Sequence, residues 1–458
     1  MALAVSIEAM REPISQGLSR PLAWRLQQLD RLAKLLADHE SAVLEALAAD
    51  LGKPPLEATF ELVAIRQELA LTRRQLRQWM APQPVPVDLS LKPGRARLLA
   101  EPLGCVLIIG PWNYPFQLTL QPLVSALAAG NAAVLKPSEH APHTAELIAR
   151  LMPLAFPSEL VQVVTGDGDV AAELLQQRFD HVFFTGGARV GRLVLAAAAP
   201  HLTPVTLELG GKSPAIVLED ADLTVTARRL VWGKGLNAGQ TCIAPDHLLV
   251  TPGVREPLLA AMAAALQRFY GDDPLASPDL GAIVNGAQFQ RLEALLEGAR
   301  SRGQVLLGGR SDPARRRLEP TLVAVESADD PLMQEEIFGP ILPVLTVPHL
   351  EGALAQVRSR PKPLALYLFS NDPAAQQRTL SSTSSGGVCF NDVVMQAGVA
   401  GLPFGGVGES GMGTYHGRAG FLTFSHQRSV LQRPFWLDVP FRYPPYAGKL
   451  GLVKRLLG

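Results

Sequence analysis

Hydrophobic residues recur at helical spacing in the first part of the chain, between positions 20 and 80. The clearest run alternates with Arg, Lys and Asp and consists of Leu22, Trp24, Leu26, Leu29, Leu32, Leu35 and Leu36. Apolar residues at this spacing form one face of an amphipathic helix, so the pattern predicts helices over 20–80. A proline-rich break follows, and the segments on either side of Pro93-Gly94 are predicted to pair as a hairpin arm.

The hydrophobic pattern changes at position 104, after which short apolar runs alternate with helical stretches. "CVLIIG", "AAVLKPS" and "HVFFTGG" each read as a buried strand that ends in glycine or polar residues. Strands and helices that alternate in this way predict a parallel, doubly wound sheet, with ligands bound along the edge where the strands end. A second alternating stretch, from about 212 to 410, predicts a second α/β domain.

Composition and charge narrow the class of protein. Of the 458 residues, 47% are apolar and 18% charged, enough for a large core and unlike a disordered chain. The 42 basic residues balance the 42 acidic ones, so no global charge favours nucleic acid or an acidic membrane. We find no run of 18 apolar residues and expect no transmembrane segment. Glu8, Arg11 and Glu12 lie where a signal peptide would need an apolar block.

The three cysteines are few and widely spaced, which argues against a disulfide framework and for a reducing compartment, so we expect a cytoplasmic protein. No His/Cys cluster has zinc-ligand spacing, and we predict no metal site. Cys105 and Cys389 lie in apolar, strand-like runs typical of buried cysteines. Cys242 lies instead in the loop-like "LNAGQTCIAPDH", with only His247 nearby as a histidine partner. Without a base, its thiolate would need backbone N–H groups or the positive ring of a cofactor.

Two glycine-rich turns compete as a dinucleotide site. Gly166, Gly168 and Ala171 give a GxGxxA pattern after a strand. Further on, "FTGGARVG" places glycines between a strand and a helix, whose N-terminus could bind a phosphate. On spacing alone, both remain equally well explained as tight turns.

Four other polar residues lie at or near predicted strand ends. Lys136 and Glu139 follow a strand and could bind a ribose, although ordinary loop charges explain them as well. Asn113, in "GPWNYP", could donate to an oxyanion or simply form an Asx turn. Glu208 lies between two leucines ahead of Gly210-Gly211, where burial would raise its pKa toward that of a general base.

Seven motifs in this order resemble the aldehyde dehydrogenase superfamily, and the resemblance covers nearly the whole chain: "GPWNYPF", "GNAAVLKPSE", "FTGGARVG", "LELGGKSP", "NAGQTCIAPD", "QEEIFGPILPV" and "PFGGVGESGMGTYHG". "KPSE" and "CIAPDH" are similar to the class 3 branch. The resemblance implies an α/β fold of two doubly wound parallel-sheet domains with a β-arm for oligomerisation. The implied division is an NAD(P)-binding domain of 1–81 and 102–209, a catalytic domain of 210–420, and an arm and tail of 82–101 and 421–458.

The resemblance also implies roles for single residues. Cys242 would attack the aldehyde carbonyl, Asn113 would stabilise the oxyanion, and Glu208 would activate the water that hydrolyses the thioester. Cofactor contacts, to NAD and possibly NADP, would come from Trp112, Lys136, Glu139, Gly186, Gly187, Gly191, Glu336 and Phe338. This assignment reduces the turn at Gly166 to a structural loop. A class 3 relative would be a homodimer.

Alternatives remain for the reaction, the substrate and the tail. A CoA-acylating relative commonly lacks the glutamate at position 208, and a non-catalytic relative would have lost Cys242, Asn113 or Glu208. No charged clamp is evident, so we expect medium- or long-chain aliphatic or aromatic aldehydes as substrates. The tail "KLGLVKRLLG" could cover a tunnel mouth, lie on a membrane or pack on the partner subunit. We favour the partner, because so short a segment binds membrane weakly.

Overall fold

The computed structural model describes residues 6–457, and its first quarter is helical as the spacing predicts. The N-terminal helices are α1 (Ile7–Ser15), α2 (Leu22–Asp38), α3 (Glu40–Leu51) and α4 (Pro55–Met80). Helix α4 begins with proline at its first position, where the missing N–H costs nothing. It packs against α2, α3 and α5.

A six-stranded sheet forms the first body, in the order β17-β7-β6-β3-β4-β5. Its strands are β3 (Cys105–Ile109), β4 (Ala132–Lys136), β5 (Val161–Val163), β6 (His181–Thr185), β7 (Val205–Glu208) and β17 (Gly411–Met412). The helices between them are α5 (Gln117–Ala129), α6 (Pro142–Ala155), α7 (Gly168–Leu175) and α8 (Ala188–Ala198). All strands run parallel except β17, which pairs antiparallel with β7 and places Gly411 opposite Glu208.

A seven-stranded sheet forms the second body, in the order β10-β13-β14-β9-β8-β15-β16. Its strands are β8 (Pro214–Val217), β9 (His247–Val250), β10 (Val305–Leu307), β13 (Thr321–Val325), β14 (Ile341–Thr346), β15 (Ala365–Phe369) and β16 (Gly387–Phe390). The larger helices are α9 (Leu223–Gly235), α10 (Pro252–Tyr270), α11 (Gly286–Ser301), α12 (Leu350–Arg358) and α13 (Pro373–Ser382). Only β10 is antiparallel to its neighbour, and β11 (Ser311–Asp312) and β12 (Arg317–Leu318) form a separate hairpin.

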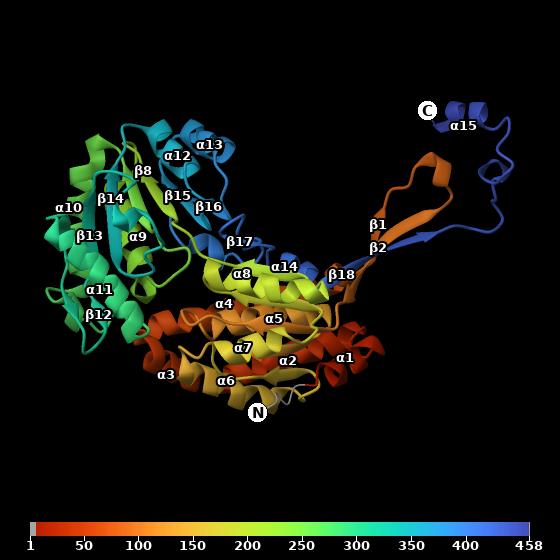
Figure 1. Ribbon diagram of the computed structural model, residues 1–458, viewed down its shortest axis with the longest axis horizontal. Helices are drawn as coiled ribbons and strands as arrows, with labels where there is room; N and C mark the ends of the chain where they lie inside the picture. Colours follow the sequence, from red (N-terminus) through yellow and green to blue (C-terminus); the bar gives the residue numbers. More distant parts are fainter. Residues whose placement is uncertain (1–5, 458) are drawn as a thin grey trace.

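A three-stranded antiparallel arm projects from the two bodies (Figure 1). The predicted hairpin is present as β1 (Gln83–Val85) and β2 (Arg95–Pro102), and β18 (Ser425–Gln432) pairs along the other side of β2. Helix α14 (Gly417–Thr423) connects β17 to this arm, and the chain ends in α15 (Leu450–Leu457). Figure 1 shows α15 beyond the arm and away from both sheets, so the tail does not cover its own chain's sheet edges.

Apolar packing covers the sheets on both faces. One hydrophobic cluster surrounds the first sheet, and two others lie against the second. Strands β3, β4, β8, β9 and β15 are buried at every position, as expected for parallel strands covered by helices. Within residues 6–457, no helix is both long enough and apolar enough to cross a membrane. The ends of the parallel strands of the first sheet, including the end of β7, form the sheet edge at which such sheets bind ligands.

Candidate active site

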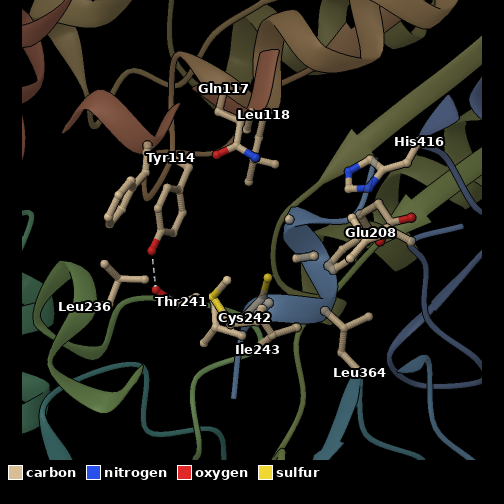
Figure 2. Close-up of a pocket in the computed structure, with 18 of the residues that line it drawn as sticks. Tyr114, Gln117, Leu118, Glu208, Leu236, Thr241, Cys242, Ile243, Leu364 and His416 are labelled. Atoms are coloured by element: carbon tan, nitrogen blue, oxygen red, sulfur yellow. Dashed lines mark hydrogen bonds between the residues drawn. The ribbon is translucent and has the colours of Figure 1, made fainter. Parts of the chain in front are cut away.

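A cavity of about 410 Å³ lies between the two bodies and reaches Cys242 and Glu208 (Figure 2). Helix α4, the start of α5, the ends of β6 and β7, the Cys242 loop and residues 394–416 all contribute to its wall. Most of the side chains in this wall are apolar: Phe60, Val63, Ala64, Leu118, Leu209, Trp232, Leu236, Ile243, Leu364, Val394, Met395, Ala397, Val399 and Phe404. The cavity therefore suits an apolar molecule with one reactive end at the sulfur.

The loop that carries Cys242 is fixed by a buried amide and an unusual backbone. The Gln240 side chain donates to Asn237 O at 3.0 Å and accepts from Val284 N at 3.0 Å. Gly239 has φ +75°, and a Cβ there would lie 2.3 Å from the carbonyl oxygen of Gly339. Only glycine fits this position, which explains the "NAGQTC" spacing physically.

Burial raises the pKa of the Cys242 thiol, and the nearby carboxyl groups of Glu336 and Glu208 raise it further. The thiol is thus neutral in the free chain, and a positive charge nearby would be needed to favour the thiolate. His247, the neighbouring histidine, lies in the buried strand β9 and does not line the cavity. Burial lowers the pKa of His247 to about 3, so it carries no charge that could activate Cys242.

Asn113 lies directly beside the Cys242 loop. Its amide Nδ2 donates to Gln240 O at 3.1 Å, and the Tyr114 hydroxyl lies 2.7 Å from Thr241 Oγ1. One hydrogen on Nδ2 is used by Gln240, which leaves a second for a ligand. The structure therefore brings the predicted oxyanion donor and the predicted nucleophile together, although they are far apart in sequence.

Glu208 ends β7 and is only 3% exposed. Neither of its carboxyl oxygens has a hydrogen-bond partner, and Glu208 is one of the residues that line the cavity. Burial raises the pKa of Glu208 well above its usual value. A carboxyl group with a raised pKa and free lone pairs in a cavity can accept a proton from water.

Lys136 and Glu139, the two predicted ribose contacts, form an ion pair at the end of β4. Lys136 Nζ lies 2.7 Å from Glu139 Oε2, with Lys136 buried and Glu139 partly exposed. Burial opposes ionisation of Glu139, but the hydrogen bond from Lys136, a backbone hydrogen bond and the charge of Lys136 together outweigh it and lower the pKa of the carboxyl group. The pair lies at the sheet edge but outside the cavity wall.

The predicted glycine turn leads into α8. A Cβ on Gly186 would lie 2.5 Å from the Phe184 ring, and one on Gly191 2.9 Å from the Leu209 side chain. Gly187 caps the helix and has open space where a side chain would be. An open helix N-terminus of this kind can accept a phosphate. By contrast, Gly166 has φ +146° and packs on Val170, as a structural turn would.

Glu336, Phe338 and Trp112 form the third part of the predicted cofactor site. The rings of Trp112 and Phe338 meet edge to face, with centroids 5.2 Å apart. Glu336 packs on Gly210, where any Cβ would overlap its carboxyl group. Burial, then the charge of Asp246, raises the pKa of Glu336 to about 8. None of the predicted cofactor residues lines the cavity that reaches Cys242 and Glu208.

Sequence reasoning gave no role to several polar residues at the site. His416 is buried in the cavity wall with both ring nitrogens unpartnered, and burial lowers its pKa to about 4. His416 has a left-handed backbone, with φ +74°, which the structure shows but the sequence does not indicate. Lys53, Glu57 and Glu61, beside or on α4, hydrogen-bond the loops of Asn113 and Cys242. Their charges look solvated in the sequence, which carries no local sign of their burial.

Metal binding has no support in the described part of the chain. Among residues 6–457, no group of three or more His, Cys, Asp or Glu side chains is arranged to hold a metal ion.

The chain is similar to known proteins over almost its whole length. The model of the aldehyde dehydrogenase family matches residues 4–430. Human aldehyde dehydrogenase family 3 member B1 is 47% identical, over 97% of this chain and 94% of its own. The rat enzyme named aldehyde dehydrogenase, dimeric NADP-preferring, is 44% identical over 98% and 99%.

Among solved structures, the substrate-bound state of Staphylococcus aureus AldH superposes with a TM-score of 0.95 at 42% identity, covering 98% of each chain. This confirms the predicted α/β fold, including the projecting arm. The family model and the identities over nearly full length confirm the resemblance that the ordered motifs indicate. The chain belongs to the aldehyde dehydrogenase family.

Proposed function

We propose that this protein oxidises an aldehyde to the carboxylic acid with NAD+ or NADP+ through an acyl-Cys242 intermediate. The observation that carries the proposal is the pairing, in one apolar cavity, of the Cys242 thiol and the unpartnered carboxyl group of Glu208. A nucleophile and a buried base that share a cavity can form and then hydrolyse a thioester.

The first step is addition of the Cys242 sulfur to the aldehyde carbon, as the thiolate that forms when the thiol releases its proton to water. The carbonyl oxygen becomes negative, and the free N–H of Asn113 Nδ2, with the backbone N–H of Cys242, stabilises it. Losing one such donor raises the barrier by about 3 kcal/mol. NAD(P)+, when bound, accepts the hydride that the aldehyde carbon loses. Glu208 then takes a proton from water, whose oxygen attacks the thioester, releasing the carboxylic acid and the thiol.

The cofactor would be held by the residues at the strand ends of the first sheet. Lys136 and Glu139 fit the hydroxyls of the adenosine ribose, and the open N-terminus of α8 at Gly187 fits a phosphate. Glu336 and Phe338 would hold the nicotinamide ribose, with Trp112 packed on Phe338. Glu139 would repel a 2′-phosphate, but its ion pair with Lys136 softens the repulsion. Both cofactors are thus proposed, in keeping with the NADP-preferring name of the rat relative.

The apolar wall favours medium- or long-chain aliphatic or aromatic aldehydes, because its side chains can bury hydrocarbon but cannot neutralise a charged group. Hydrolysis is favoured over transfer to CoA, since Glu208 is present and positioned at the cavity. A CoA-acylating activity remains the alternative outcome of the test below.

We further propose a homodimer joined through the arm. The arm and the start of the tail expose large apolar side chains, among them Val85, Leu89, Leu431, Phe435 and Trp436. Apolar surface of this kind is typical of an interface, and the rat relative is named dimeric. The tail would dock on the partner subunit rather than on a membrane. The three free cysteines suit a reducing compartment, the cytoplasm.

On the same reasoning, residues 1–81 and 102–209 would form the NAD(P)-binding domain and 210–420 the catalytic domain. The arm and tail would be 82–101 and 421–458. Strand β17, from within 210–420, adds to the sheet of the first domain.

The test is NADH and NADPH formation by the purified protein with aldehydes from acetaldehyde to hexadecanal and with benzaldehyde, each with and without CoA. We expect turnover without CoA that rises with the apolar area of the aldehyde. Turnover only in the presence of CoA would reassign the protein to the acylating branch.

A further inference from the structure

Lys53 and Glu61 form a buried ion pair that the proposed mechanism does not use. Lys53 Nζ lies 2.5 Å from Glu61 Oε1, and both side chains are completely buried. Lys53 precedes α4, and Glu61 lies within that helix. A buried ion pair is rarely more stabilising than a well-packed apolar pair of the same size, because both charges lose their hydration. Stability alone is therefore a poor reason for this pair.

The remaining hydrogen-bonding capacity of the pair is directed at the loop of Asn113. Lys53 Nζ donates to the carbonyl oxygen of Asn113 at 2.8 Å and lies 4.0 Å from the centroid of the Tyr114 ring. Glu61 Oε2 accepts from the backbone N–H groups of Phe116 at 3.1 Å and Gln117 at 2.9 Å. The pair thus fixes the backbone on both sides of the segment from Asn113 to Gln117.

Glu57, one turn earlier on α4, holds the second loop of the site. Its Oε2 accepts from Asn237 N at 2.8 Å, three residues before Gln240. The Asn237 side chain donates to the same Asn113 oxygen at 2.7 Å. Asn237 has φ +52°, a left-handed conformation that needs support from its surroundings. One end of α4 therefore contacts both the Asn113 loop and the loop that leads to Cys242.

We propose that Lys53 and Glu61, assisted by Glu57, are positioning residues that set the Asn113 amide relative to the Cys242 sulfur. None of the three lines the cavity, and they act through the backbone of the Asn113 loop and of Asn237. Oxyanion donors act only within about 2.7–3.1 Å of the developing charge. The proposal rests on the proposed oxyanion role of Asn113, and it predicts a defect confined to formation of the acyl-enzyme.

The test is a double-mutant cycle between the ion pair and Asn113. Lys53→Met with Glu61→Gln removes both charges together, so neither is left buried alone. In the native background we expect the acylation rate constant, read from NADH formation in a single turnover with enzyme in excess, to fall ~10²-fold, as for a misplacement of about 1 Å. NAD+ affinity should stay unchanged. In the Asn113→Ala background the same double change should lower the acylation rate by about 2-fold or less.

Two other outcomes of the cycle distinguish failure of the positioning role from failure of the oxyanion role. Equal fold-losses in both backgrounds would overturn the positioning role and leave the proposed function intact. No loss from Asn113→Ala alone would overturn the oxyanion role and, with it, this inference. If the double variant does not fold, Lys53→Met alone goes through the same cycle, because Glu61 still has its two backbone N–H partners in that variant.

A matched control lies on the same helix. Arg66 pairs with Glu40 at 2.6 Å, but both side chains are about 40% exposed and contact no active-site loop. Arg66→Met should change the acylation rate by about 2-fold or less, because exposed ion pairs contribute little. A large loss in this control would mean that any disturbance of α4 impairs the site.

Discussion

Glu61 and Glu208 are both buried carboxyl groups, and they belong to two regions of the active site that are built in opposite ways. Under the Asn113 loop, both oxygens of Glu61 have partners: Lys53 and the backbone N–H groups of Phe116 and Gln117. At the end of β7, neither oxygen of Glu208 has any. Glu61 does not line the cavity, whereas Glu208 does.

This difference is what we expect if Glu61 supports the active site and Glu208 takes part in the proposed reaction. A carboxyl group whose two oxygens both accept from fixed donors holds those donors, and the backbone that carries them, in place. A carboxyl group without partners costs stability, commonly about 1–3 kcal/mol, and keeps its lone pairs for a ligand. The region of Glu208 therefore gives up stability where the reaction needs a base, whereas the region of Glu61 supplies the rigidity.

The largest effect is expected when the proposed nucleophile, on which both regions act, is removed. Cys242→Ala should abolish aldehyde oxidation while NAD+ binding, measured by titration of the cofactor, persists. Cys389→Ala is the matched control, because Cys389 lies in β16 outside the cavity wall, and it should stay active. Measurable turnover by the Cys242→Ala variant would refute the nucleophile assignment and remove the common target of the two regions.

The second prediction is that substitutions of the two carboxyl groups, Glu208 and Glu61, slow different steps of the reaction. Glu208→Gln should slow deacylation by roughly 10²–10⁴-fold, the usual contribution of a general base, and a burst of NADH should appear or grow. Glu61→Gln should slow acylation instead and produce no such burst. Stopped-flow NADH absorbance distinguishes the two. If both variants lose the same step, support and chemistry are not divided as we propose.

The third effect is a pH dependence that belongs to Glu208 alone. The base must be ionised to act, and burial raises the pKa of Glu208, so the rise of deacylation with pH is displaced upward. Below that pKa the rate should increase about tenfold per pH unit and then level off. Glu208→Gln should lack the rise. A pH profile shared by the variant and the native enzyme would assign it to another group.

The smallest effect concerns Glu68, a buried carboxyl group that is intermediate between Glu61 and Glu208 in the hydrogen bonds that it accepts. Its Oε1 accepts from Gly417 N at 2.7 Å, and burial raises its pKa from 4.5 to about 7. The folded chain therefore keeps a proton that the unfolded chain releases above about pH 4.5, so this group lowers stability as pH rises toward 7. The loss amounts to about 3 kcal/mol at most.

Glu68→Gln should remove this loss, so its stability relative to the native protein should improve between about pH 5 and pH 8. Urea unfolding at both pH values measures the difference. An unchanged difference between variant and native protein would show that Glu68 does not hold a proton in the folded state.

The sequence predicts the elements better than it predicts their contacts. Alternating apolar runs locate the parallel strands, and the resemblance carried by the ordered motifs assigns Cys242, Asn113 and Glu208 to one site. The pairing of the two-residue strand β17 with β7 has no such sign, since it joins segments about 200 residues apart. Lys53 and Glu61 escape notice for a related reason. Charges at helical spacing are usually solvated, and only the contact with the Asn113 loop buries them.

The most direct test of the account is the mass of the trapped intermediate. Glu208→Gln is mixed with NAD+ and octanal, quenched in acid, digested and analysed by mass spectrometry. We predict one octanoyl group per active site, on the peptide that contains Cys242, with one NADH released for each. An unmodified Cys242 peptide despite NADH release, or an acyl group on another residue, would contradict the proposed roles of Cys242 and Glu208 together.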